Sequence, residues 1–124
     1  MMFETTTIFI LGRVLLSFFL LFFGFSHLVS ISNFTKIAKR AKIPFPKFSV
    51  FVTGVLFIVA STSFIFWVYV NVALWYLITF FIISALWIHR FWEYSKKDQH
   101  TNSFNSFVSN MLVASVLMIL SLFI

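Results

Sequence analysis

The chain has 124 residues, of which 61% are hydrophobic and only 10% charged, and its mean hydropathy is +1.05. A water-soluble enzyme is excluded, because about a quarter of the residues of soluble domains are charged. Intrinsic disorder is also excluded, since disordered chains are poor in the aromatic residues that make up 22% of this one. The chain contains no cysteine, which rules out disulfides, thiolate nucleophiles and cysteine-ligated metals. The composition therefore predicts a membrane protein.

Four apolar segments are long enough to cross a bilayer, which takes roughly 20 residues of helix. We expect helices at about 8–29, 48–66, 70–90 and 104–124. The apolar block 48–88 would be about twice as long as the hydrocarbon is thick, so it must turn back, at about 66–71. No segment alternates with the period of two that a β-barrel requires. The predicted fold is an all-α transmembrane four-helix bundle, with one domain over 1–124.

The remaining segments complete this expected organisation. The first span is not expected to be a removable signal peptide, because the run is long and its only early charge is Glu4. The polar stretches 30–33 and 95–103 are predicted loops. The segment 43–46, with two prolines, is predicted to lie rigidly on the membrane surface.

Basic residues indicate the orientation of the chain. Eight lie in the two polar connections, namely Lys36, Lys39, Arg40, Lys42, Lys47, Arg90, Lys96 and Lys97, and the opposite side has none outside the first helix. By the positive-inside rule the connections are cytoplasmic and both termini lie outside. We interpret the net charge of +6 as topology plus attraction to anionic lipid headgroups, and expect the bilayer, not nucleic acid, as partner.

Polar side chains within the spans are the candidates for a site, because an unpaired polar group costs several kcal/mol in lipid. The four helices place His27, Thr53, His89 with Trp92, and Asn110 near their expected cytoplasmic ends. Asn110 lies six residues into the fourth predicted helix, or about 9 Å. Two interpretations stay open. The residues serve as interhelical hydrogen bonds and interfacial caps, or they line a pocket for a quinone carbonyl or a lipid headgroup.

Other kinds of site fit less well. A haem held by His27 and His89 is a third alternative, which is disfavoured because both histidines lie at helix ends. Three histidines without a carboxylate at metal spacing predict no metal site. Arg13 lies about 21 Å from His27 along the first helix and on the inward face. We expect its guanidinium to reach outward to Glu4 or the terminal carboxylate of Ile124, with a role as ligand anchor as the alternative.

Motifs along nearly the whole chain resemble the DoxX family of small four-helix membrane proteins. They are Gly12-Arg13, Phe23-Gly24, His27-Leu28, the basic segment 39–42 before Ile43-Pro44, Thr53-Gly54, His89-Arg90-Phe91-Trp92, and Phe107 with Asn110. The positions that match the family pattern are Arg13, Gly24, Gly54, His89, Trp92 and Asn110. The resemblance implies a bacterial or archaeal inner-membrane protein, and some family members look like membrane subunits of quinone-linked oxidoreductases.

Two departures from the family pattern bear on chemistry. Phe57 stands where members often carry a glutamate, and Ala114 and Ser115 replace a paired glycine. Without that carboxylate the chain lacks an obvious intramembrane proton carrier. The spans also offer no evident pair of nucleophile and base, so the chain is not expected to be catalytic on its own.

The functional expectation is an accessory or anchor subunit of a quinone-linked redox complex. Its quinone or lipid site would include His27, Thr53, His89, Trp92 and Asn110, with Arg13, Gly24 and Gly54 as structural positions. The alternatives are a small transporter or channel subunit, which the apolar middle of each helix disfavours, and a purely structural membrane protein. Whether the chain forms a homo-oligomer stays open.

Overall fold

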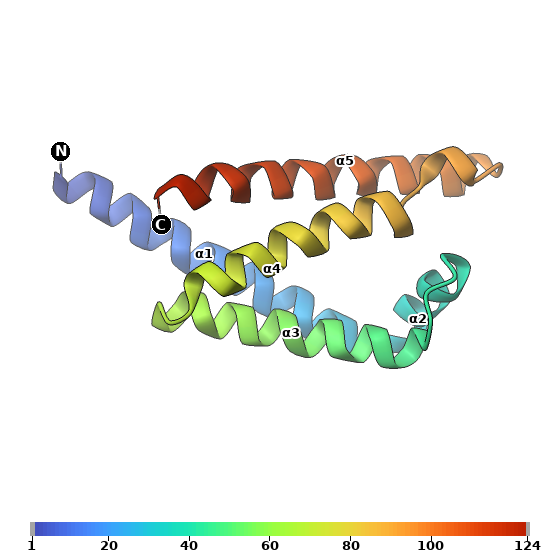
Figure 1. Cartoon of the computed structure of the whole chain (residues 1–124), viewed down its shortest axis with the longest axis horizontal. Coiled ribbons are helices and arrows are strands. Elements are labelled where there is room, and N and C mark those ends of the chain that lie inside the picture. The colour runs from blue at the N-terminus through green and yellow to red at the C-terminus, as the bar shows by residue number, and fades with distance from the viewer. Residues whose placement is uncertain (1, 124) are drawn as a thin grey trace. The chain divides into compact units, whose positions relative to one another are not determined.

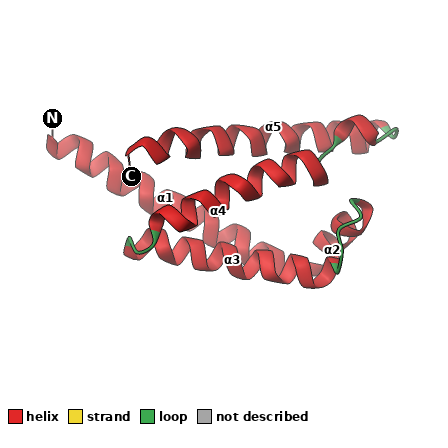
Figure 2. Cartoon of the chain, viewed as in Figure 1, coloured by secondary structure: helices red, strands yellow, loops and turns green. Residues whose placement is uncertain are grey.

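The computed structural model describes residues 2–123, with side chains from Thr6 onward, and the regular structure of this range is entirely helical (Figure 2). The helices in Figure 1 are α1 (Met2–Val29), α2 (Ile31–Arg40), α3 (Pro46–Phe66), α4 (Val70–Ile83) and α5 (Lys97–Leu120). Three shorter pieces are the π-helix η1 (Ser84–Ile88) and the 3₁₀ helices η2 (Phe91–Glu93) and η3 (Ser121–Phe123).

Four helical segments are long and apolar enough to cross a membrane. They are Thr6–Val29, Pro46–Phe66, Val70–Glu93 and Lys97–Phe123. The predicted class, an all-α protein with four membrane-spanning helices, is confirmed. The chain divides into two compact units, Met1–Val70 (unit 1) and Asn71–Ile124 (unit 2). Unit 1 contains α1, α2 and α3, and unit 2 contains nearly all of α4 together with η1, η2 and α5.

In unit 1, the antiparallel helices α1 and α3 pack with their backbones in direct contact (Figure 1). A Cβ atom added at Gly24 would lie 2.8 Å from the carbonyl oxygen of Gly54 and 2.7 Å from Cγ1 of Ile58. Two turns nearer the start of α1, the buried Ser61 hydroxyl donates to the carbonyl oxygen of Ser17 at 2.7 Å. Small residues therefore form the contact, as they do where membrane helices approach closely.

A second helix occupies the connection that the sequence predicts to begin as a loop at 30–33. Ser30, with φ −102° and ψ 36°, breaks the end of α1, and α2 starts at the next residue. α2 packs on α3, and Ala38 and Ala41 are buried. This packing explains why a short polar stretch is helical, because most helical stability in proteins comes from tertiary contact. Local helix propensity does not reveal such a contact.

In unit 2, the last span begins at Lys97, seven residues before the predicted start at 104. The helix therefore includes most of the predicted loop 95–103, with Asp98 in its first turn, where a carboxylate interacts favourably with the helix dipole. Asn110 lies thirteen residues into this helix, about 20 Å from its start, instead of the expected 9 Å.

The glycine contact generates a test with an internal control. We expect Gly24→Ala to lower the stability of the protein by about 1–3 kcal/mol, because the new methyl group would overlap the Gly54 carbonyl oxygen and Ile58. Nothing lies within 4 Å of a Cβ added at Gly12, so Gly12→Ala should keep stability or raise it by up to about 1 kcal/mol. Thermal unfolding in mild detergent measures both. Equal midpoints for the two variants would contradict the close contact.

Candidate functional site

The five predicted site residues fall in different units. His27 and Thr53 belong to unit 1, and His89, Trp92 and Asn110 belong to unit 2. The predicted meeting of all five stays a prediction, and the surroundings of each group are defined within its own unit.

His27 lies at the last turn of α1 and is held by its own helix and by two aromatic rings. Its Nδ1 bonds to the carbonyl oxygen of Phe23 at 2.8 Å. The imidazole stacks on Phe34 of α2, with centroids 4.1 Å apart and planes at 15°, and a tilted Phe57 lies 5.6 Å away. Since a carbonyl can only accept, the proton is on Nδ1, and in the neutral ring Nε2 is an acceptor. Neutral His27 thus has no second N–H to offer to a quinone carbonyl.

Thr53 is likewise satisfied within its own helix. Its Oγ1 donates to the carbonyl oxygen of Ser49 at 2.8 Å, which uses the only hydrogen that the hydroxyl carries. The neighbouring Gly54 lies against the Cβ atom of His27, since a Cβ added at Gly54 would be 3.0 Å from it. The hydrogen bonds of His27 and Thr53 therefore stay within their own helices, and neither joins two helices.

Arg13 caps the C-terminal end of α3. Its Nε donates to the carbonyl oxygen of Phe64 at 2.7 Å, and its terminal Nη2 donates to that of Ile65. Carbonyls in the last turn of a helix have no intrahelical partner and carry the negative end of the helix dipole. The expected anions, the Glu4 side chain and the carboxylate of Ile124, lie outside the described residues. Among the described residues, the hydrogen-bond partners of the guanidinium are these two backbone carbonyls.

The turn after α3 brings an aromatic ring to the same guanidinium. Trp67 has φ 57°, in the left-handed region, and its ring centroid lies 4.9 Å from the Arg13 Cζ. The backbone N–H groups of Trp67 and Val68 both bond to the carbonyl oxygen of Ser63. A left-handed conformation costs a residue other than glycine about 1–3 kcal/mol. The cation–π contact and the edge-on ring of Phe9, 5.2 Å away, offset that cost.

We expect Arg13→Leu to destabilise the protein by about 2–3 kcal/mol, because two helix-end carbonyls lose a charged donor in apolar surroundings. Arg13→Lys should recover only part of the loss, since a single ammonium cannot reproduce the two-nitrogen geometry and the stacking. Thermal midpoints in detergent and membrane abundance measure the effect, with Val14→Leu as the matched change at an exposed neighbour. An unaltered midpoint for Arg13→Leu would refute the capping role.

In unit 2, the third span continues from α4 into the π-helix η1, which ends at Ile88, directly before His89. The His89 N–H bonds to the carbonyl oxygen of Ser84 at 3.1 Å, a five-residue separation. The buried Ser84 hydroxyl accepts from the side-chain amide of Asn110 at 3.3 Å. π-helical turns occur frequently at functional sites. The second amide hydrogen and the carbonyl oxygen of Asn110 make no hydrogen bond within the described residues.

Aromatic rings link this π-helix to the same face of α5. Phe107, one turn before Asn110, lies 5.4 Å from Phe91 and 6.0 Å from Trp92, centroid to centroid. His100 meets Phe91 edge-on at 5.4 Å. Since residues three apart share a helix face, Asn110 and the ring of Trp92 border one surface of unit 2 through Phe107. Trp92 is 54% exposed, so this surface is open to a ligand.

Sequence reasoning selected Asn110 and Trp92 but missed Ser84 and the central Phe91. Ser84 carried a usable signal, because a hydroxyl in the middle of an apolar span needs a partner and Asn110 is an obvious donor. The π-helix had none, since the segment Ser84–Ile88 contains no proline or glycine.

Metal and haem chemistry can be compared with these surroundings. Among the described side chains, those of residues 6–123, no group of three or more His, Asp and Glu is placed to hold a metal ion. His27 has the tautomer that suits ligation through Nε2, because Nδ1–H is bonded to a carbonyl. The second proposed haem ligand, His89, lies in the other unit, so the haem alternative remains a hypothesis.

No family model, curated protein or solved structure matches the chain.

Proposed function

We propose that this membrane protein is a DoxX-like accessory or anchor subunit of a quinone-linked redox complex in a bacterial or archaeal inner membrane, and that it holds a quinone headgroup on unit 2. The site is the surface bordered by Asn110 and Trp92, and His89, three residues before Trp92, is its third predicted member. The chain binds and orients the headgroup and leaves the redox step to a partner subunit.

The observation that carries this proposal is the state of Asn110. Its amide is positioned by the Ser84 hydroxyl, yet one amide hydrogen and the carbonyl oxygen remain available. A quinone carbonyl needs a donor of this kind, and its ring needs a flat apolar wall. The exposed indole of Trp92 supplies that wall, together with a second N–H donor. Small-molecule sites generally combine apolar walls with a few placed polar groups.

Unit 1 acts as a scaffold in this proposal. The hydrogens of Thr53 and His27 are already given to backbone carbonyls. Their place in the site, as first expected, is therefore supported less well than that of the unit 2 residues. A purely structural role for the whole chain is the second candidate, and the hydrogen bonds that His27 and Thr53 make within their own helices favour it.

Bound quinone distinguishes the two candidates. Purified protein in mild detergent should release quinone on solvent extraction, detected by mass spectrometry. The double variant Asn110→Ala, Trp92→Phe should retain about tenfold less, because losing two hydrogen bonds of roughly 0.5–1.5 kcal/mol each weakens binding to that extent. The matched control is Asn105→Ala, an exposed amide on the same helix. Quinone absent from the parent protein, or equal in parent and double variant, would exclude the site and leave the structural role.

The proposed orientation has a separate test. A reporter that is active only in the cytosol should stay inactive when fused to either end of the chain. It should be active when inserted into the basic connection next to Lys42, because positively charged connections stay cytoplasmic. Activity of either terminal fusion would reverse the assignment.

A further inference from the structure

The segment 31–47, formed by α2 and the connection into α3, carries an unusual concentration of positive charge. Its cations are Lys36, Lys39, Arg40, Lys42 and Lys47. No acidic residue occurs anywhere between Glu4 and Glu93. The lysines of the segment are exposed, and no described anionic group pairs with Lys36, Lys39 or Lys42. These three ammonium groups are thus available to an external anion.

The connectivity keeps α2 close to the bilayer surface. α2 begins two residues after the span Thr6–Val29 ends, and Pro46 opens the next span six residues after Arg40. Because α2 also packs on α3, it cannot move away from the ends of the two spans. The headgroup layer on each side of a bilayer is about 5–7 Å thick, so a helix tethered in this way lies at its depth.

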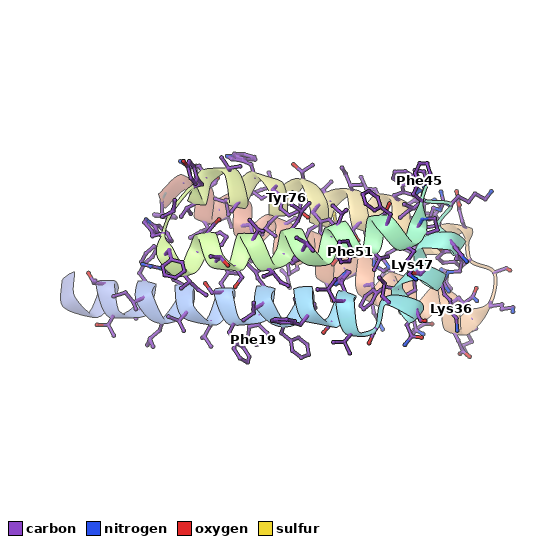
Figure 3. All side chains as sticks on the ribbon, turned by 90° about the horizontal axis from the view of Figure 1, so that it is seen from below. Phe19, Lys36, Phe45, Lys47, Phe51 and Tyr76 are labelled. Atoms are coloured by element: carbon purple, nitrogen blue, oxygen red, sulfur yellow. The ribbon has the colours of Figure 1, made fainter. Side chains whose placement is uncertain are left out.

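Side chains of both kinds needed for an interface lie on this segment. Figure 3 shows Lys36, Phe45 and Lys47 gathered at one end of unit 1. Phe45 is 80% exposed and Phe48 is 67% exposed, so both rings are available to the acyl boundary while the ammonium groups reach outward. Interfacial helices combine basic and apolar side chains in this manner and bind anionic lipids by both.

We propose that the segment 31–47 binds the headgroups of anionic phospholipids, so that the chain selects such lipids from a mixed bilayer. The phosphates accept from Lys36 and Lys39, which lie three residues apart on one face of α2, and from Lys42 beyond its end. The proposal is independent of the quinone site, because the two use different residues in different units.

Native mass spectrometry of the full chain in mild detergent tests this selection directly. With equal amounts of phosphatidylglycerol and phosphatidylcholine added, the parent protein should carry about tenfold more of the anionic lipid, and Lys36→Gln with Lys39→Gln should lower that preference about fivefold. The matched control is Lys96→Gln with Lys97→Gln, which removes the same charge from the other connection and should keep the preference. Lys36→Arg with Lys39→Arg should also keep it.

A parent protein without preference, a preference that survives Lys36→Gln with Lys39→Gln, or an equal loss in both glutamine doubles would overturn the proposal. Circular dichroism shows whether each variant keeps its helices. If the first double unfolds, Lys42→Gln with Lys47→Gln decides, because these residues lie outside α2. Loss of the anionic-lipid preference in that double supports the proposal, and retention overturns it.

Discussion

The bond from the Arg13 guanidinium to the last carbonyls of α3 sets the register of the first two spans. Eleven residues separate Arg13 from Gly24 along α1, and eleven separate Ile65 from Gly54 along α3, a distance of about 16 Å on each helix. The hydrogen bond from Ser61 to the carbonyl of Ser17 lies between these two contacts in the same register. Sliding one helix along the other would separate the charged donor from its acceptors and bring side chains against the glycines.

The same constraint explains why a bulky residue occupies a left-handed position at the end of α3. A glycine there would relieve the backbone strain at Trp67, but it would remove the ring that covers the guanidinium. In lipid, where backbone and side-chain polar groups find no water, covering and bonding a cation matters more than about 1–3 kcal/mol of local strain. The turn is therefore part of the cap, and α1 and α3 are held at this end by charge and at the other by backbone contact.

The four spans could be predicted from the sequence, because the thickness of the hydrocarbon layer sets the length of an apolar helix, and that length is visible as a run of hydrophobic residues. Sequence reasoning could not identify partners that are backbone atoms or that come from tertiary packing. For Arg13 the sequence predicts carboxylate partners, which lie outside the described residues, and it gives no sign of the carbonyl acceptors of Phe64 and Ile65. The sequence predicts a loop at the start of α2, because the packing of α2 on α3 and the burial of Ala38 and Ala41 have no signal in the local sequence. For the candidate site, residue type identified Asn110 and Trp92, but which donors remain available depends on hydrogen bonds that only the structure resolves.

That availability differs between the small polar residues in the spans of unit 1 and Asn110 of unit 2. In unit 1 the hydroxyls of Ser17, Ser61 and Thr53 each donate to a backbone carbonyl, so the helices gain rigidity and lose capacity to bind. In unit 2 the π-helical turn displaces the regular ladder, and the amide of Asn110 is only partly used. An amide that is incompletely paired in lipid costs a few kcal/mol, and a ligand that pairs with it removes this cost. A polar ligand with an apolar body, which enters from the lipid phase, would pair with it without exposing the helices to water.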